Sequence, residues 1–174
     1  LITKTEVIYP SVNIQKSFKK EKLITFVGRL NFSKGYDLFA KTIIKILDEF
    51  PKWKALSIGD EDRRSVYIDH KKHTELGFLN HKKTLQILSK TEIAVVPSRW
   101  EEPFGRTALE ASSCGCATII SNRGGLIETT NYPVVLKKLD EINLYKEIKN
   151  LITKPNQRKK IQRLSRKNIK HSIP

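Results

Sequence analysis

Short apolar runs alternate with amphipathic segments along most of this 174-residue chain, and this alternation limits the folds that it can adopt. The clearest runs lie at 23–27, 54–58, 92–96 and 117–120, and they are rich in β-branched residues. Strands that are largely apolar on both faces are typical of a parallel sheet covered by helices. We therefore predict an α/β fold, a Rossmann-like parallel sheet with helices on both faces.

Weaker elements complete the pattern between these runs. A helix is expected after Gly35, where Leu38, Thr42, Ile46 and Phe50 recur near helical spacing before Pro51. The other elements are strands at 75–79 and 134–136, helices at 81–90, 106–113, 144–152 and 157–168, and a short helix with a loop within 60–73. Residues 1–20 are interpreted as the end of an interdomain linker, and residues 21–174 as one domain with a single core.

Three loops follow predicted strands at the edge of the sheet where ligands bind. In open parallel sheets, ligands bind beside the turns at the carboxyl ends of the strands. The loops at 28–35, 98–105 and 121–128 begin at such ends. We expect the functional residues to come from these loops.

The chain is strongly cationic, with 33 Lys and Arg against 18 Asp and Glu. This balance favours anionic partners such as nucleotides, nucleic acid or an acidic membrane face. Residues 148–174 hold no Asp or Glu but nine Lys and Arg, among them Arg158, Arg163 and Lys170. The simplest interpretation of this run is a solvated helix face, with weak attraction to anionic lipid and a dedicated nucleic-acid surface as alternatives.

Several features bear on origin and location. The sequence starts at Leu1 and contains no Met, so we interpret it as a piece of a longer protein. No run approaches the roughly 20 apolar residues of a membrane span, and residues 1–10 lack the pattern of a signal peptide. Cys114 and Cys116 lie too close in sequence for an ordinary disulfide, and they indicate buried thiols in a reducing compartment. His70 and His73 are expected at the surface, without a metal.

The first loop carries Arg29 and Lys34 between Gly28 and Gly35. A guanidinium can bind two phosphate oxygens at once, a lysine adds a mobile charge, and glycines let the backbone approach a ligand closely. The loop is therefore a candidate diphosphate site, although it lacks the Lys-Ser/Thr pair of a Walker motif. Taken alone, a basic loop is more often simply solvated.

The second loop places Glu102 before a predicted helix and Glu110 within that helix. Backbone amides near Gly105, Arg106 and Thr107 would lie at the helix amino terminus, which favours a phosphate. A carboxylate inside the helix can bind the hydroxyls of a ribose, and one before it can bind the hydroxyls of a sugar. The plain alternative makes Glu102 a helix-terminus acid and Glu110 a surface residue.

These motifs together resemble the retaining GT-B glycosyltransferases of family 4, also called glycosyl transferases group 1. The resemblance rests on Glu102-Pro103-Phe104-Gly105 with Glu110 eight positions after Glu102, and on Val27-Gly28-Arg29-Leu30 with Lys34-Gly35. Ile58-Gly59-Asp60, Leu76-Gly77-Phe78-Leu79, Gly124-Gly125-Leu126-Ile127-Glu128 and the linker-like Val7-Ile8-Tyr9-Pro10 follow the same family pattern in order. It covers roughly residues 7 to 165.

The resemblance implies that this chain is the C-terminal, donor-binding half of a GT-B fold. Arg29 and Lys34 would neutralise the diphosphate of a nucleotide sugar, which is also the leaving group. Glu102 would hold the transferred sugar, and Glu110 would bind the ribose. The remaining implied donor contacts are Gly28, Phe104 and Gly105, the main-chain amides of Arg106 and Thr107, and Leu79 beside the base. Glu101 leaves the carboxylate assignment open, because it directly precedes Glu102.

The same resemblance implies a hexosyltransferase that retains the anomeric configuration and needs neither metal nor cofactor. The donor would be a UDP-, GDP- or ADP-linked sugar. A saccharide or lipid-linked acceptor would be held mainly by an amino-terminal domain that this chain lacks, so the chain alone is expected to bind donor but to transfer little. We expect a cytoplasmic protein, or one peripheral to the inner face of the membrane.

Two other functions remain open at this stage. One is another nucleotide-sugar enzyme on the same fold, such as an epimerase or a phosphorylase. The other is a basic nucleic-acid-binding module, which only the charge suggests, because the basic run has no interleaved aromatics and no helix-turn-helix pattern. We expect no specific nucleic-acid partner.

Overall fold

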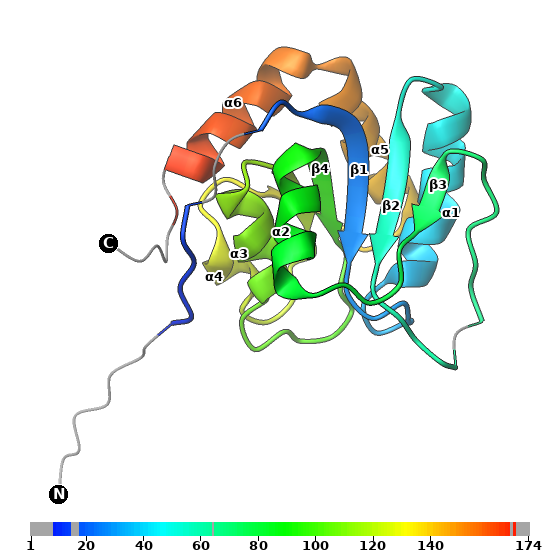
Figure 1. Ribbon diagram of the computed structural model, residues 1–174, viewed down its shortest axis with the longest axis horizontal. Helices are drawn as coiled ribbons and strands as arrows, with labels where there is room; N and C mark the ends of the chain where they lie inside the picture. The colour runs from blue at the N-terminus through cyan, green and yellow to red at the C-terminus, as the bar shows by residue number, and fades with distance from the viewer. Residues whose placement is uncertain (1–8, 15–17, 64, 168, 170–174) are drawn as a thin grey trace, which may run out of the picture.

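Figure 1 shows the computed structural model, in which one six-stranded sheet lies between helices. The structure describes residues 9–14, 18–63, 65–167 and 169. The elements in chain order are β1 (Glu21–Val27), α1 (Tyr36–Glu49), β2 (Lys54–Ile58), β3 (His73–Glu75), α2 (His81–Lys90), β4 (Thr91–Val96), α3 (Arg106–Ser113), β5 (Ala117–Ile120), α4 (Leu126–Thr129), β6 (Val134–Val135), α5 (Glu141–Thr153) and α6 (Pro155–Lys167).

The strand order is β3-β2-β1-β4-β5-β6, and every neighbouring pair is parallel. From β1 the chain builds outward to β2 and β3, and it then crosses back to place β4 on the other side of β1. Loops that leave β1 and β4 therefore diverge, and the crevice between them is the usual ligand site of such a sheet. The predicted fold class is confirmed.

Helices cover both faces of the sheet, and the alternation of side chains along β4 shows how. Ile93 and Val95 belong to the larger core, which α1 and α5 cover, while Ala94 belongs to a smaller core with Ala111 of α3 and Leu88 of α2. Successive residues of a strand point to opposite faces, so these two cores lie on opposite sides. Figure 1 shows α6 near the amino-terminal ends of the strands.

The cysteines belong to the smaller core, as the sequence indicates. Cys114 and Cys116 are free thiols, 2% and 0% exposed. Burial raises the pKa of Cys116 to about 12 and also raises that of Cys114. Both thiols are therefore held in the neutral form. The prediction of buried thiols is confirmed.

Three predicted elements differ from the structure. The described residues of 60–73 form no helix, because Val66 and Ile68 both pack on the core at a two-residue spacing, which is that of an extended chain. The strand expected at 75–79 is β3 at His73–Glu75, because the backbone turns at Gly77 with φ of 63°. The turn at Gly124 and Gly125 continues into the short helix α4.

Two interpretations of side chains also change. His73 is not a solvated loop residue: it lies in β3, its Nε2 is 2.9 Å from Ser57 Oγ, and burial lowers its pKa. Arg158 does not belong to a solvated face, since it is buried and bonded to Glu92. The neighbouring cations Lys159, Lys160, Arg163 and Lys167 are exposed, whereas Lys170 and His171 lie outside the described residues.

No helix within the described part of the chain combines the length and the apolar character that a bilayer span requires.

The linker motif is only partly described, because Val7 and Ile8 lie outside the described residues. Its Tyr9 packs on Phe104, with ring centroids 5.6 Å apart, and its hydroxyl donates to Glu128 at 2.9 Å. This hydrogen bond raises the pKa of Tyr9. Tyr9 thus lies at the loop edge of the sheet.

Candidate functional site

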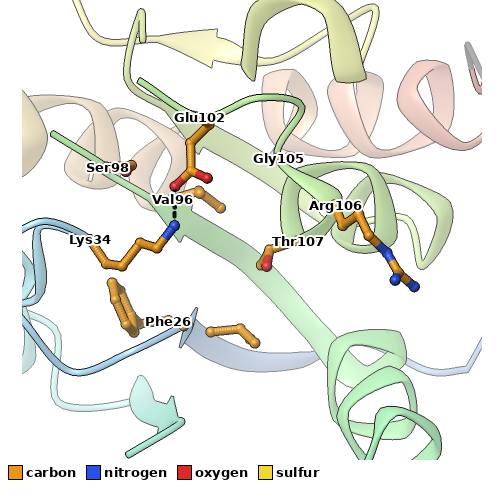
Figure 2. Close-up of a pocket in the computed structure, with 10 residues that line it drawn as sticks. Phe26, Lys34, Val96, Ser98, Glu102, Gly105, Arg106 and Thr107 are labelled. Carbon is orange, nitrogen blue, oxygen red and sulfur yellow. Dashed lines mark hydrogen bonds and ion pairs between the residues drawn. The ribbon is translucent and has the colours of Figure 1, made fainter. Parts of the chain in front are cut away.

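A cavity of about 240 Å³ opens at the crevice between the carboxyl ends of β1 and β4. It is lined by Phe26, Val27, Gly28, Lys34, Val96, Ser98, Glu102, Gly105, Arg106 and Thr107. Figure 2 shows Lys34 and Glu102 reaching toward each other across it from two different loops. The predicted first and second loops therefore meet at one site.

The centre of this cavity is an ion pair between Lys34 and Glu102. Lys34 Nζ donates to Glu102 Oε1 at 2.6 Å, and the two side chains are 31% and 12% exposed. The pair is reachable from the cavity and joins residues 68 positions apart. A phosphate could take Lys34 as its counter-charge, and a sugar hydroxyl could donate to Glu102.

Asn31 shapes the loop that carries Lys34. Its Oδ1 accepts hydrogen bonds from Ser33 Oγ at 2.9 Å and from the Lys34 amide at 3.1 Å. Its Nδ2 donates to Glu61 Oε2 at 3.0 Å. The short polar side chain thus replaces backbone partners inside the turn, a common role of Asn in turns.

The first and second loops are locked together through one carbonyl group. Ser33 O accepts from the amides of Arg99 at 2.8 Å and Trp100 at 3.0 Å, and from Ser98 Oγ at 3.3 Å. A Cβ at Gly35 would lie 2.0 Å from Pro97 O, so only glycine permits this approach. Arg99 also donates to the two carboxylate oxygens of Asp37 through its two terminal guanidinium nitrogens. The contacts of the Ser33 carbonyl were not predicted from the sequence, because no local motif singles out Ser33.

The third predicted loop is held to the second by Glu101. Its Oε2 accepts from the Gly124 amide at 2.6 Å, and its Oε1 lies 3.1 Å from Arg123 Nη1. Glu102 contributes its backbone carbonyl, which accepts from the Gly125 amide at 2.6 Å. Of the two adjacent carboxylates, Glu101 therefore holds the turn, and Glu102 is the one that faces the cavity.

The amino terminus of α3 forms one wall of the cavity. Gly105 precedes the helix with φ of 88° and has no side-chain cap, so its turn leaves the first amide groups of α3 uncovered by a side chain. Amides in a first helical turn have no intrahelical acceptor, and the helix dipole favours an anion there. In Figure 2 the side chain of Thr107 lies near the cavity, whereas that of Arg106 points away from Lys34 and Glu102.

Glu110 lies one turn further along α3 and is only 7% exposed. Its Oε1 is 3.1 Å from His81 Nε2, at the start of α2, and 3.4 Å from Arg106 Nη2. The plain alternative, in which Glu110 is a surface residue, is therefore wrong. The contact with His81 was not predicted, since His81 carries no motif of its own.

A second cavity of about 450 Å³ adjoins the first and shares Val27 and Gly28 with it. Its lining includes Arg29, Asp60, Leu79 and Thr84. The structure thus separates Arg29 from Lys34, because the two cations line different cavities along the same strand end. Leu79 lines this cavity together with Ile58 and Gly59, at the end of β2.

The structure therefore gathers most of the predicted residues at one edge but not in one pocket. Gly28, Lys34, Glu102, Gly105, Arg106 and Thr107 share the first cavity, and Gly28, Arg29 and Leu79 the second. Phe104 and Glu110 lie beside them, packed against Tyr9 and His81 respectively. Among the described residues, no group of three His, Cys, Asp or Glu side chains is arranged to hold a metal ion.

Comparison with known families gives one clear match. The family described as glycosyl transferases group 1 matches residues 11–168. Among curated proteins, an uncharacterized glycosyltransferase of Methanocaldococcus jannaschii is 34% identical over 121 residues, 66% of this chain and 30% of that protein. The chain spans 30–44% of the length of the first three curated relatives that it matches.

Solved structures show the same fold. The C-terminal domain of a glycosyl transferase group 1 protein (LpcC) from Francisella tularensis superposes with a TM-score of 0.77 at 22% identity, covering 90% of this chain and 89% of that domain. Anabaena HepE in complex with UDP and glucose gives a TM-score of 0.71 at 19% identity, covering 85% of this chain and 43% of that protein. These matches identify the sheet and its helices as the C-terminal half of a GT-B fold.

Proposed function

The chain belongs to the glycosyl transferases group 1 family, and we propose that it is the donor-binding domain of a retaining glycosyltransferase of family 4. The observation that carries the proposal is the Lys34–Glu102 pair, 2.6 Å apart, beside the amino terminus of α3. A cation, a carboxylate and helix-terminal amides at one crevice suit a ligand that joins a diphosphate to a sugar. A nucleotide sugar has this composition.

The proposed roles follow the positions of the groups. Lys34 and the amides of Arg106 and Thr107 bind the phosphates, and Arg29 contributes charge from the adjoining cavity. Glu102, with the backbone of Phe104 and Gly105, binds hydroxyls of the transferred sugar. Glu110, eight residues after Glu102, binds the ribose, and Leu79 lies beside the base.

The reaction breaks the bond between the sugar and the diphosphate, so negative charge develops on the leaving diphosphate. Lys34, Arg29 and the α3 amides are placed to stabilise that charge, and they supply what a divalent cation supplies elsewhere. We therefore propose metal-independent transfer without a cofactor. Attack of the acceptor hydroxyl from the face that the diphosphate leaves retains the anomeric configuration.

The donor is proposed to be a UDP-, GDP- or ADP-linked sugar. UDP and UDP-glucose are bound by the HepE neighbour, which supports the first of these. The acceptor is proposed to be a saccharide or lipid-linked saccharide, held mainly by a second domain, since the chain spans less than half of its relatives. We propose that the protein is cytoplasmic. The positive charge of the chain would give its basic surface a weak attraction to anionic lipid.

Calorimetric titration with UDP, GDP, ADP and CDP, without added metal, tests the proposal. We expect selective binding of one nucleotide, weakened at least tenfold by Glu110→Ala and by Arg29→Ala. The exposed Lys41 of α1 supplies a matched control, and Lys41→Ala should leave the affinity unchanged. A folded protein that binds no nucleotide, but binds duplex DNA with steep salt dependence, would instead support a nucleic-acid-binding module.

A further inference from the structure

Glu110 is held by contacts from two helices, and both contacts use the same oxygen. His81 Nε2 is 3.1 Å from Glu110 Oε1, and Arg106 Nη2 is 3.4 Å from that oxygen. Within the described residues, neither group bonds to Oε2. Both contacts thus fix the carboxylate through Oε1 and leave Oε2 out of these two bonds.

The contact of Glu110 with His81 is the shorter of the two, at 3.1 Å against 3.4 Å for Arg106. The position of His81 is set by the start of α2, where Asn80 Oδ1 accepts from the Lys83 amide at 3.0 Å, and α2 packs on α3 through Leu88 and Ala111. The Arg106 contact is longer, and Arg106 precedes Glu110 by four residues, the less favourable order for such a pair on a helix. The two side chains are similarly exposed, 59% for His81 and 65% for Arg106, so the ranking rests on the shorter distance and the order along the helix.

The chemistry of the contact fixes the direction of the hydrogen bond. An ionised carboxylate can only accept, so the Nε2–H of His81 donates to Oε1. A carboxylate with one oxygen bonded is restricted in rotation about its terminal torsion, which is otherwise broad. The second oxygen is then oriented before the ligand binds, so binding loses less side-chain conformational entropy.

We propose that His81 is a positioning residue for donor binding, which orients Glu110 so that Oε2 receives the ribose hydroxyls. This inference rests on the proposed function, because it assigns His81 a role only through Glu110. His81 does not contact the reacting atoms. Its effect is therefore confined to ligands that carry the hydroxyls.

The experiment compares UDP, GDP and ADP with their 2′,3′-dideoxy counterparts by calorimetry on the 174-residue chain. His81→Leu should lower the affinity for the bound ribonucleotide about tenfold, the scale of one hydrogen bond to a charged group, and leave the dideoxy form within about twofold. His81→Gln, which keeps an N–H donor, should restore part of the loss. Lys83→Leu, on the exposed side of α2, is the matched control.

Glu110→Gln separates failure of this inference from failure of the proposed function. If Glu110→Gln weakens ribonucleotide binding and His81→Leu does not, the role of His81 is overturned and the donor site stands. Equal losses of ribo- and dideoxynucleotide affinity in His81→Leu would also overturn it, since a general structural defect acts on both. If the wild-type protein binds none of the three ribonucleotides, the donor site and the role of His81 both fall.

Discussion

Each edge of the sheet holds an ion pair between a basic and an acidic side chain, but one pair borders a cavity and the other is enclosed by the protein. At the carboxyl edge, Lys34 and Glu102 pair at 2.6 Å beside a cavity. At the amino edge, Arg158 and Glu92 also pair at 2.6 Å, but their side chains are only 7% and 13% exposed. An equal distance therefore does not mean an equal function.

The difference lies in what surrounds each pair. Arg158 also donates to the carbonyls of Leu151 and Ile152, and Gln162 donates to both the backbone and the carboxylate of Glu92. The guanidinium lies 5.2 Å from the ring of Trp53. These contacts enclose the Arg158–Glu92 pair in a closed network, whereas the Lys34–Glu102 pair borders a cavity and is open to it. A closed network supports the fold, and an open one can bind a ligand.

The largest effect should come from breaking the amino-edge pair. Arg158→Leu leaves the carboxylate of Glu92 buried without its counter-charge, which costs about 3–5 kcal/mol of unfolding free energy. Urea denaturation measures this loss, and Lys159→Leu, at the exposed neighbour, should show almost none. A double variant, Glu92→Leu with Arg158→Leu, should recover much of the stability. Equal stability of Arg158→Leu and wild type would contradict the comparison.

Alkaline pH should also lower the unfolding free energy, through the buried thiol of Cys116 near the amino edge. Burial raises the pKa of Cys116 from 9.0 to about 12, so above pH 9 the unfolded state loses a proton that the folded state keeps. Cys116 then contributes a loss of about 1.4 kcal/mol per pH unit between pH 9 and 12, with full stability below pH 9. Cys116→Ser keeps a donor for Leu88 O but does not ionise there. Its unfolding free energy, measured at pH 8, 9.5 and 10.5, should fall less steeply.

Lys20 acts in the opposite direction at pH values below its ordinary pKa of 10.5. Burial lowers its pKa, so the folded state releases the lysine proton before the unfolded state does, and stability rises with pH in that window. Both proteins in the comparison retain Lys20, so the difference between their slopes reports Cys116. Identical slopes for wild type and Cys116→Ser would show that the thiol is not held neutral.

The smallest effect on stability, and a clear one on binding, should come from Lys34→Met. Glu102 and Glu92 are similarly exposed, 12% and 13%, but Glu102 borders a cavity that water can enter and its partner Lys34 is 31% exposed, so the unfolding free energy should fall by less than in Arg158→Leu. Nucleotide affinity should fall about tenfold or more, because a charge-assisted contact to phosphate is lost. Lys41→Met, at an exposed position of α1, is the control. Loss of stability without loss of affinity would make this pair resemble the amino-edge pair.

The sequence predicted the open edge better than the closed one. Glycines and charged residues that follow an apolar run indicate a loop at a strand end. This signal led to the prediction that Lys34, Glu102 and Gly105 lie in such loops. The start of α2 at His81, of α3 at Arg106 and of β5 at Ala117 also agreed with the prediction. These signals are local, since each depends on a few neighbouring residues.

Contacts that depend on how distant segments pack could not be predicted. Arg158 and Glu92 are 66 residues apart, and a run without acids gave no reason to bury one of its arginines. His81 and Glu110 meet only because α2 packs on α3. Within 60–73, Val66 and Ile68 anchor an extended segment, where the charged sequence suggested a helix.

The Ser33 carbonyl has a consequence for how such a site changes over time. Three donors from the second loop converge on it, and none of them belongs to the side chains of Lys34 or Glu102. The frame that sets the spacing of the two loops is therefore independent of the side chains that they present. Under the proposed function, point substitutions at the presented positions would alter which sugar or phosphate is accepted while the frame stays intact, so specificity could diverge among descendants without a new fold.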